Sequence, residues 1–146
     1  MSVEENKAIV YDIFEAINNG DLDALDKYYS VDCIGHSPPY GKVVGLSALK
    51  SAWNNHLRGF PDTQVNVKEV IAEGDAVTAR VTIKGTNTGQ FAGRITGKEG
   101  FGLGLILYHM DNGKIVEEWD HWDELGMWWQ LGHRLDPPIV PNQSQS

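Results

Sequence analysis

The residues best suited to chemistry gather near the C-terminus, in the stretch EEWDHWDELGMWWQLG from Glu117 to Gly132. It holds four tryptophans, five acidic side chains and one histidine within sixteen residues. Carboxylates beside indole rings are suited to proton transfer, because apolar walls raise the pKa of a carboxyl group towards neutral pH. The stretch is therefore either the wall of an active site or an aromatic plug that closes a domain.

Asp120 is the leading candidate for a general base. The segment KIVEEWDHW has the composition of a strand, so Glu118, Asp120 and Trp122 are expected on one face, and Trp119 and His121 on the other. A second carboxylate and an indole beside Asp120 would both raise its pKa. Asp123 is better interpreted as the N-cap of the helix that follows.

Two histidines and two tryptophans are further candidates. His36 lies in the loop CIGHSPPYG, and His56 shares the apolar face of a predicted helix with Trp53 and Phe60. Either histidine could orient a substrate carbonyl or share a proton with Asp120, or simply bond to a backbone partner. Trp53 and Trp122 are the better pocket candidates, whereas packing is favoured for Trp128 and Trp129.

Arg80 lies inside a strand among apolar residues. It could bind an anionic ester group or pair with Glu118, and a purely structural ion pair is at least as probable. His121 and Asp123 form the local part of a two-His-one-carboxylate iron site, but His133 follows too soon to be a convincing third ligand. We therefore expect no metal.

The GFGLGL segment has the glycines of a nucleotide loop without the helix that should follow it. Its glycines are more plausibly needed for sharp bending of the sheet.

The elements that must position these residues change character along the chain. Apolar residues at helical spacing predict helices near 9–17 and 22–29, and a third that Ser47 caps and GFPD ends. From Gln64 the period becomes two, which predicts a strand pair turned at 73–75 and another turned at Asn112-Gly113. Helices followed by a meander indicate an α+β domain over residues 1–135, and the proline-rich remainder, 136–146, is expected to be extended or disordered.

Composition excludes several classes of partner. Twelve basic against twenty acidic residues give a net charge of −8, which disfavours nucleic acid. No apolar run is long enough to span a membrane. A single cysteine, Cys33, and an N-terminus without the features of a signal peptide lead us to expect a cytoplasmic protein.

The order of elements and the motifs GFPD, IAEGDAVTARVTIKGTNTGQF, GKIVEEWDHWD and ELGMWWQLG resemble the SnoaL-like polyketide cyclases, or ester cyclases, of the NTF2-like superfamily. The resemblance runs from about Glu5 to Gly132. It implies a cone-shaped α+β barrel, in which helices pack on a strongly curved antiparallel sheet around an apolar pocket, and assembly as dimers or larger oligomers. It also implies that Asp120 is the general acid/base of an intramolecular aldol condensation, and that Ile106 stands where a cyclase histidine falls.

We therefore expect an enzyme without a cofactor that acts on a hydrophobic carbonyl substrate through Asp120, with His36 as a second catalytic candidate. Asp120 should face a closed cavity lined by Trp53, Phe60, Tyr108 and Trp122, and the remaining candidates for substrate contact are His56, Arg80, Ile106 and Glu118. The alternatives are a protein that only binds an apolar ligand, or an epoxide hydrolase or isomerase on the same fold.

Assembly follows from strand parity. Both faces of the predicted sheet carry apolar side chains, namely Val77, Ala79, Val81 and Ile83 on one strand and Leu103, Leu105 and Leu107 on its neighbour. Only one face can cover the core, and a large apolar patch is unusual on a monomer. We expect a homodimer or higher homo-oligomer formed sheet to sheet.

Overall fold

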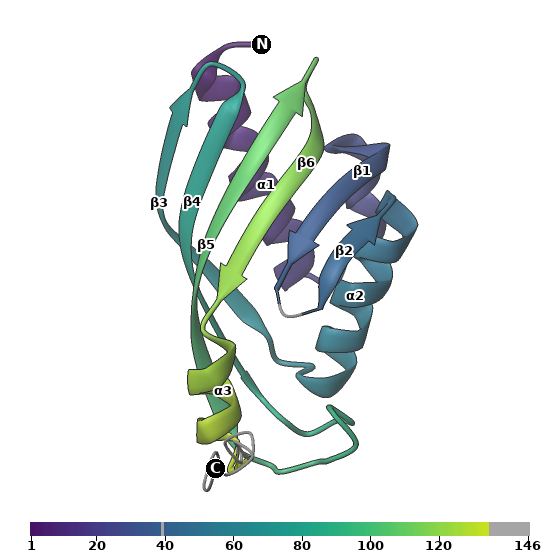
Figure 1. Cartoon of the computed structure of the whole chain (residues 1–146), viewed down its shortest axis with the longest axis vertical. Helices are drawn as coiled ribbons and strands as arrows, with labels where there is room; N and C mark the ends of the chain where they lie inside the picture. Colours follow the sequence, from purple (N-terminus) through teal and green to yellow (C-terminus); the bar gives the residue numbers. More distant parts are fainter. Residues whose placement is uncertain (39, 135–146) are drawn as a thin grey trace, which may run out of the picture.

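The computed structural model describes residues 1–38 and 40–134, and it begins with the helix that the apolar spacing predicts. α1 (Val3–Asn18) starts at a capping box, in which the Ser2 hydroxyl accepts from the Glu5 amide and the Glu5 carboxylate accepts from the Ser2 amide. Its buried face includes Val10 and Ile13 and packs against β3 and β4. This helix lies behind the sheet in Figure 1.

The predicted second helix is wrong beyond its first turns. A short 3-10 helix, η1 (Leu22–Lys27), gives way to a hairpin of β1 (Tyr29–Ser37) and β2 (Gly41–Val44). The β-branched residues of this region favour extended backbone, and Pro38 restricts Ser37 to it. Alternation in YSVDCIG was the signal for β1, because Tyr29, Cys33 and Gly35 face inwards.

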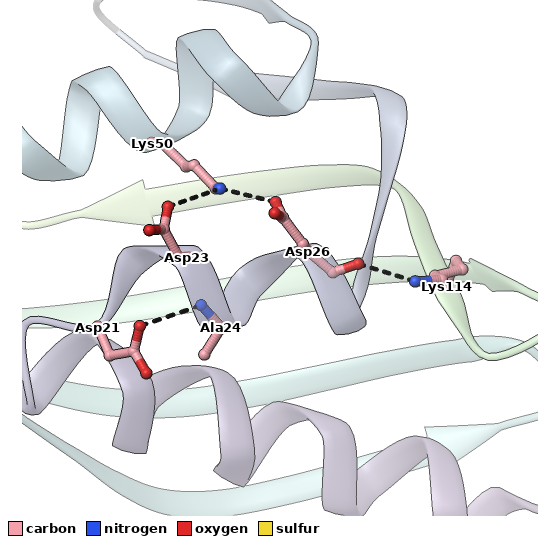
Figure 2. Close-up of polar contacts among 6 residues, drawn as sticks. All are labelled: Asp21, Asp23, Ala24, Asp26, Lys50 and Lys114. Atoms are coloured by element: carbon pink, nitrogen blue, oxygen red, sulfur yellow. Dashed lines mark hydrogen bonds and ion pairs between the residues drawn. The ribbon is translucent and has the colours of Figure 1, made fainter.

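Charged residues fix η1 between its neighbours (Figure 2). Asp21 accepts from the Ala24 amide at 3.2 Å, and Lys50 on the next helix pairs with Asp23 and Asp26 at 3.3 and 2.7 Å. Lys114 donates to the backbone carbonyls of Asp26 and Lys27, each at 2.9 Å. Exposed ion pairs stabilise little individually, so this cluster mainly fixes the geometry with which the chain enters β1.

The remaining elements follow the expected order: α2 (Leu46–Gly59), β3 (Gln64–Glu73), β4 (Ala76–Thr86), β5 (Glu99–Asp111), β6 (Lys114–Trp122) and α3 (Glu124–Gln130). Gly45, not Ser47, is the N-cap of α2. The predicted turns are confirmed, since Gly74, Asn112 and Gly113 have φ of 56°, 47° and 77°.

The strands form one sheet of order β2-β1-β6-β5-β4-β3. Neighbours in the described sheet are antiparallel except β1 and β6, which are parallel. The expectation of a wholly antiparallel sheet is therefore wrong at this pair. Figure 1 shows the curved sheet with α1 behind it, α2 beside β2, and α3 beyond the end of β6.

Alternation along β4 and β5 separates the two faces of the sheet. Val77, Ala79 and Val81 are fully buried against the core, whereas Leu103 and Leu105 are 53% and 58% exposed on the outer face. The glycines of GFGLGL face inwards and make room for other groups. A Cβ on Gly104 would lie 2.6 Å from the Trp122 ring, and one on Gly100 would lie 3.3 Å from Met127 of α3.

The predicted tail, 136–146, lies outside the described residues, and the division into a domain and a tail stays a prediction. Within residues 1–38 and 40–134, no helix has both the length and the apolar character needed to cross a membrane.

Candidate functional site

A cavity of about 780 Å³ lies between the inner face of the sheet and the helices. Its walls include Ile13 and Ile17 of α1, Trp53 of α2, and Tyr108 of β5. Exposed Tyr40 also lines it, so the cavity opens to the surface and the expectation of a closed cavity is wrong. The volume is that of a site for a drug-sized organic molecule.

Asp120 lies in this cavity with its two oxygens in different surroundings. Oδ2 accepts from the Ser37 hydroxyl at 3.0 Å and from the Trp122 indole N–H at 2.8 Å. Oδ1 is buried and has no hydrogen-bond partner among the described residues. A buried polar atom without a partner costs free energy, and such atoms are often explained by a catalytic role.

Glu118 lies two residues earlier on the same face of β6 and is only 7% exposed. The Tyr29 hydroxyl donates to its Oε2 at 2.7 Å. Burial raises the pKa of Glu118 to about 7; the Tyr29 hydrogen bond opposes this shift and the charge of Asp120 adds to it. Burial, with the Glu118 charge second, also raises the pKa of Tyr29 well above its usual value, so Tyr29 stays a donor.

His56 forms the opposite kind of wall, within a group of aromatic rings. It stacks on Phe60 at 5.0 Å between ring centroids and meets Trp53 edge-on at 6.0 Å. Burial lowers the pKa of His56 to about 4, so the imidazole is neutral near pH 7. Trp53 also meets Trp122 edge-on at 6.3 Å, which links this wall to the indole that holds Asp120.

The expected strand faces are confirmed for β6. Glu118, Asp120 and Trp122 line the cavity, whereas Trp119 and His121 line a separate depression on the outer face with Leu105 and Leu107. Ile106, whose register partner is Asp120, also lines the cavity, as do the expected residues Trp53, His56 and Tyr108.

His36 does not reach the cavity. It lies between Gly35 and Ser37, which do line it, so the alternation of β1 turns His36 to the outer face. There its Nε2 pairs with Glu117 Oε1 at 2.7 Å, and the ring stacks on Trp119 at 4.9 Å. The expectation that His36 acts beside Asp120 is therefore wrong, because the segment is a strand and not a loop.

Arg80 is also on the outer face. Its Nε lies 3.3 Å from Glu69 Oε2 of β3, and both side chains are more than half exposed. Its strand neighbours Ala79 and Val81 take the buried face, which forces Arg80 outwards. Neither the pairing with Glu118 nor a role in binding an anionic ester group is compatible with this position.

Phe60 is 1% exposed and packs behind His56, so it supports the cavity wall without lining it. Phe91, which sequence reasoning missed, takes the wall position instead and contacts Phe60 at 5.0 Å. It lies in the connection between β4 and β5, which buried Asn87 fixes by donating to the carbonyls of Gly59 and Gly89.

Tyr29 and Ser37 were the other residues missed. Both lie on β1, and both donate to carboxylates of β6. The alternation that identifies β1 was the available signal, but nothing local in the sequence indicates that β1 pairs with β6.

The proposed iron ligands do not converge. His121 lines the outer depression, Asp123 caps α3 through the Gly126 amide, and His133 packs against Trp128 at 4.5 Å. Among the described residues, no group of three or more His, Cys, Asp or Glu side chains is placed to hold a metal ion.

Comparisons with known proteins agree with this geometry. The SnoaL-like polyketide cyclase family matches residues 8–131. A search of curated proteins found no match.

Several solved structures are similar to this chain. IdmH from Streptomyces antibioticus, a proposed polyketide cyclase, is 27% identical, with a TM-score of 0.80 over 88% of this chain and 99% of its own. AclR from Streptomyces galilaeus, a proposed hydroxylase, is 30% identical, with a TM-score of 0.81 over 90% and 98%. A SnoaL-like protein from Jannaschia sp. CCS1 is 20% identical and shares the fold, with a TM-score of 0.82 over 90% and 94%.

The fold is therefore the mixed α+β architecture of the NTF2-like cyclases, with helices on a six-stranded curved sheet. The family match covers the strands that carry Tyr29, Ser37, Glu118 and Asp120, and α2 with His56. The chain belongs to the SnoaL-like polyketide cyclase family.

Proposed function

We propose that this protein is an enzyme without a cofactor that closes a ring in a hydrophobic, polyketide-like carbonyl compound, by intramolecular aldol condensation. The observation that carries the proposal is Asp120, with Oδ2 held by two donors and Oδ1 buried in the cavity wall without a partner among the described residues. A carboxylate held in this way is poised to accept a proton from a bound molecule.

The mechanism follows from this arrangement. Asp120 removes a proton from a carbon flanked by carbonyl groups, and conjugation stabilises the enolate without a metal. The carbanion attacks a second carbonyl carbon of the same molecule, and the new alkoxide takes up a proton. The cavity would hold the flexible substrate folded, so that the reacting carbons are already close. Ser37 and Trp122 fix Oδ2 and thereby orient Oδ1.

The test is Asp120→Asn, assayed with an aryl ketone whose β-dicarbonyl side chain closes a six-membered ring. Asparagine keeps the shape of the side chain but cannot take the proton, so kcat should fall by about 10²- to 10⁴-fold. Binding of the same compound, followed by tryptophan fluorescence, should change little.

Glu117→Gln is the matched control, because Glu117 lies on the same strand but contacts His36 on the outer face. Its kcat should stay within twofold of the wild-type value. Turnover by Asp120→Asn at the wild-type rate would rule out the catalytic assignment.

The second candidate function is binding of an apolar ligand without reaction. The neutral His56 and the aromatic walls around it favour this alternative, since they suit an uncharged aromatic molecule equally well. Wild-type protein that binds such ring-closing compounds tightly but converts none of them, over a pH range from 5 to 9, would favour the binding protein.

A further inference from the structure

Two carboxyl groups share one cavity in contrasting surroundings. Asp120 accepts hydrogen bonds from Ser37 and Trp122 on one oxygen, whereas Glu118 accepts one, from Tyr29. Glu118 is the more deeply buried of the two, and none of the ion pairs among the described residues involves it. A buried carboxyl group without a cationic partner favours its neutral form.

The groups that face Glu118 act in the same direction. Tyr29 and Cys33 of β1, Tyr108 of β5 and Asp120 of β6 are its titratable neighbours. The first three are uncharged near neutral pH, because burial raises the pKa of both phenols and brings that of the Cys33 thiol to about 11.

The rest of the cavity adds no cation at Glu118. α1 contributes the apolar residues Ile13, Phe14 and Ile17. The remaining charged or titratable groups that line the cavity lie on other elements, and these are Tyr40, His56, Arg58, Asp123 and Glu124. Burial also raises the pKa of Glu124.

We infer that Glu118 is a second catalytic residue, the general acid that donates a proton to the carbonyl oxygen under attack while Asp120 takes one from carbon. This inference rests on the proposed function and assigns its two proton transfers to two groups. Pairs of titratable groups whose surroundings separate their pKa values commonly divide acid and base roles in this way.

The proton and electron balance closes without a co-reactant. The C–H bond breaks, its proton goes to Asp120, and its electron pair forms the new C–C bond. The carbonyl π pair moves to oxygen, which takes the proton of Glu118. Transfer of one proton from Asp120 to Glu118 restores the starting state, and the product is an isomer of the substrate.

Tyr29 has a defined part in this scheme as a positioning residue. Its hydroxyl donates to Glu118 Oε2, so it stabilises the carboxylate that forms when Glu118 gives up its proton. The same hydrogen bond lowers the pKa of Glu118 against the effect of burial, which brings the pKa to about 7. The acid is thus poised near the pH at which it works.

The experiment is the pH dependence of kcat for ring closure of the β-dicarbonyl aryl ketone. The wild-type rate should fall above about pH 7, as Glu118 loses its proton. Tyr29→Phe removes a hydrogen bond that favours the ionised form, so this alkaline fall should move upwards by roughly one pH unit. In Glu118→Gln the alkaline fall should disappear and kcat should drop at least tenfold, roughly the contribution of one acid catalyst. Glu117→Gln should keep the wild-type profile.

A second measurement is independent of turnover. In protein labelled with ¹³C at the glutamate side-chain carboxyl, the resonance lost in Glu118→Gln should titrate near pH 7, and higher in Tyr29→Phe. Titration near pH 4.5, or a wild-type alkaline limb in Glu118→Gln, would overturn the role of Glu118 and leave that of Asp120 standing. Full activity of Asp120→Asn, or no turnover by the wild-type enzyme, would count against both.

Discussion

Neighbouring glutamates on β6 show how one residue of strand alternation sets chemical behaviour. Glu117 pairs with His36 on the outer face, while Glu118 is enclosed beside Asp120. Identical side chains thus have different tasks because successive strand residues point to opposite faces. The outer pair is partly open to solvent, where a charge is cheap to keep, and the inner one is not.

Glu118 should make stability depend on pH in a predictable direction. Its pKa rises from 4.5 to about 7 on folding, so between these values the folded protein binds more protons than the unfolded chain. Its stabilising contribution is therefore present at low pH and is lost as pH rises through 7. Relative to the wild type, Glu118→Gln should gain about 2 kcal/mol in free energy of unfolding between pH 5 and pH 8.

Urea denaturation of both proteins at the two pH values measures this gain, with Glu117→Gln as the control for a lost surface charge. A difference that is the same at pH 5 and pH 8 would mean that Glu118 is not held near neutrality.

His56 should have the opposite dependence. Its pKa falls from 6.5 to about 4 on folding, so below pH 6.5 the unfolded chain takes up a proton that the folded protein refuses. Stability is therefore lost as pH falls from 6.5 towards 4. His56→Gln should remove up to about 2 kcal/mol of the loss between pH 7 and pH 5.

Calorimetric or urea unfolding would detect this change. His121→Gln is a suitable control, since His121 is exposed on the outer face. Equal acid sensitivity in wild type and His56→Gln would place the cause elsewhere.

At the level of elements, β5 positions the catalytic face of β6 through what it lacks. Gly104 leaves the space that the Trp122 ring occupies, and this ring donates to Asp120. A methyl group on Gly104 would lie 2.6 Å from the indole, so the ring has to shift. We expect Gly104→Ala to lower kcat about tenfold or more, because the Asp120 oxygen loses a fixed donor.

Gly102→Ala is the comparison, since its added methyl group would meet Ile83 at 3.1 Å and not the indole. Both variants should lose stability through crowding. Only Gly104→Ala should also shift the tryptophan emission and lose the larger factor in kcat. Equal effects of the two substitutions on kcat would show that Trp122 does not orient Asp120.

The sequence predicts the faces of this sheet well and its pairing less well. Alternation is a local property, so the inward set of Glu118, Asp120 and Trp122 follows from the residues themselves. The position of His36 depends on β1 being a strand beside β6, a contact between segments about eighty residues apart that no short-range pattern contains. For the same reason Tyr29 and Ser37 could not be assigned to the site.

For the whole molecule, the outer face of β5 remains the feature that calls for a partner. Phe101, Leu103 and Leu105 are 45%, 53% and 58% exposed along one strand. Contiguous apolar surface of this kind is typical of an interface. We expect a homodimer in which two such faces bury more than roughly 1,200 Å² in total.

Light scattering at micromolar concentration tests the dimer, and Leu105→Glu should shift it towards the monomer by placing a charge in the interface. Ile95→Glu is the control, because Ile95 is equally exposed but lies outside the strands. A wild-type mass near 16.2 kDa would contradict the expectation.

The parallel pairing of β1 with β6 also fixes when the site can come into existence. The hydrogen bonds from Tyr29 to Glu118 and from Ser37 to Asp120 span 89 and 83 positions of the chain. On the ribosome, β1 emerges early and has no edge to join until the last strand has been made. Contacts of such long range also slow folding, because a long loop must close before they form. The nascent chain must therefore keep its apolar inner wall from aggregating until synthesis of the domain is almost complete.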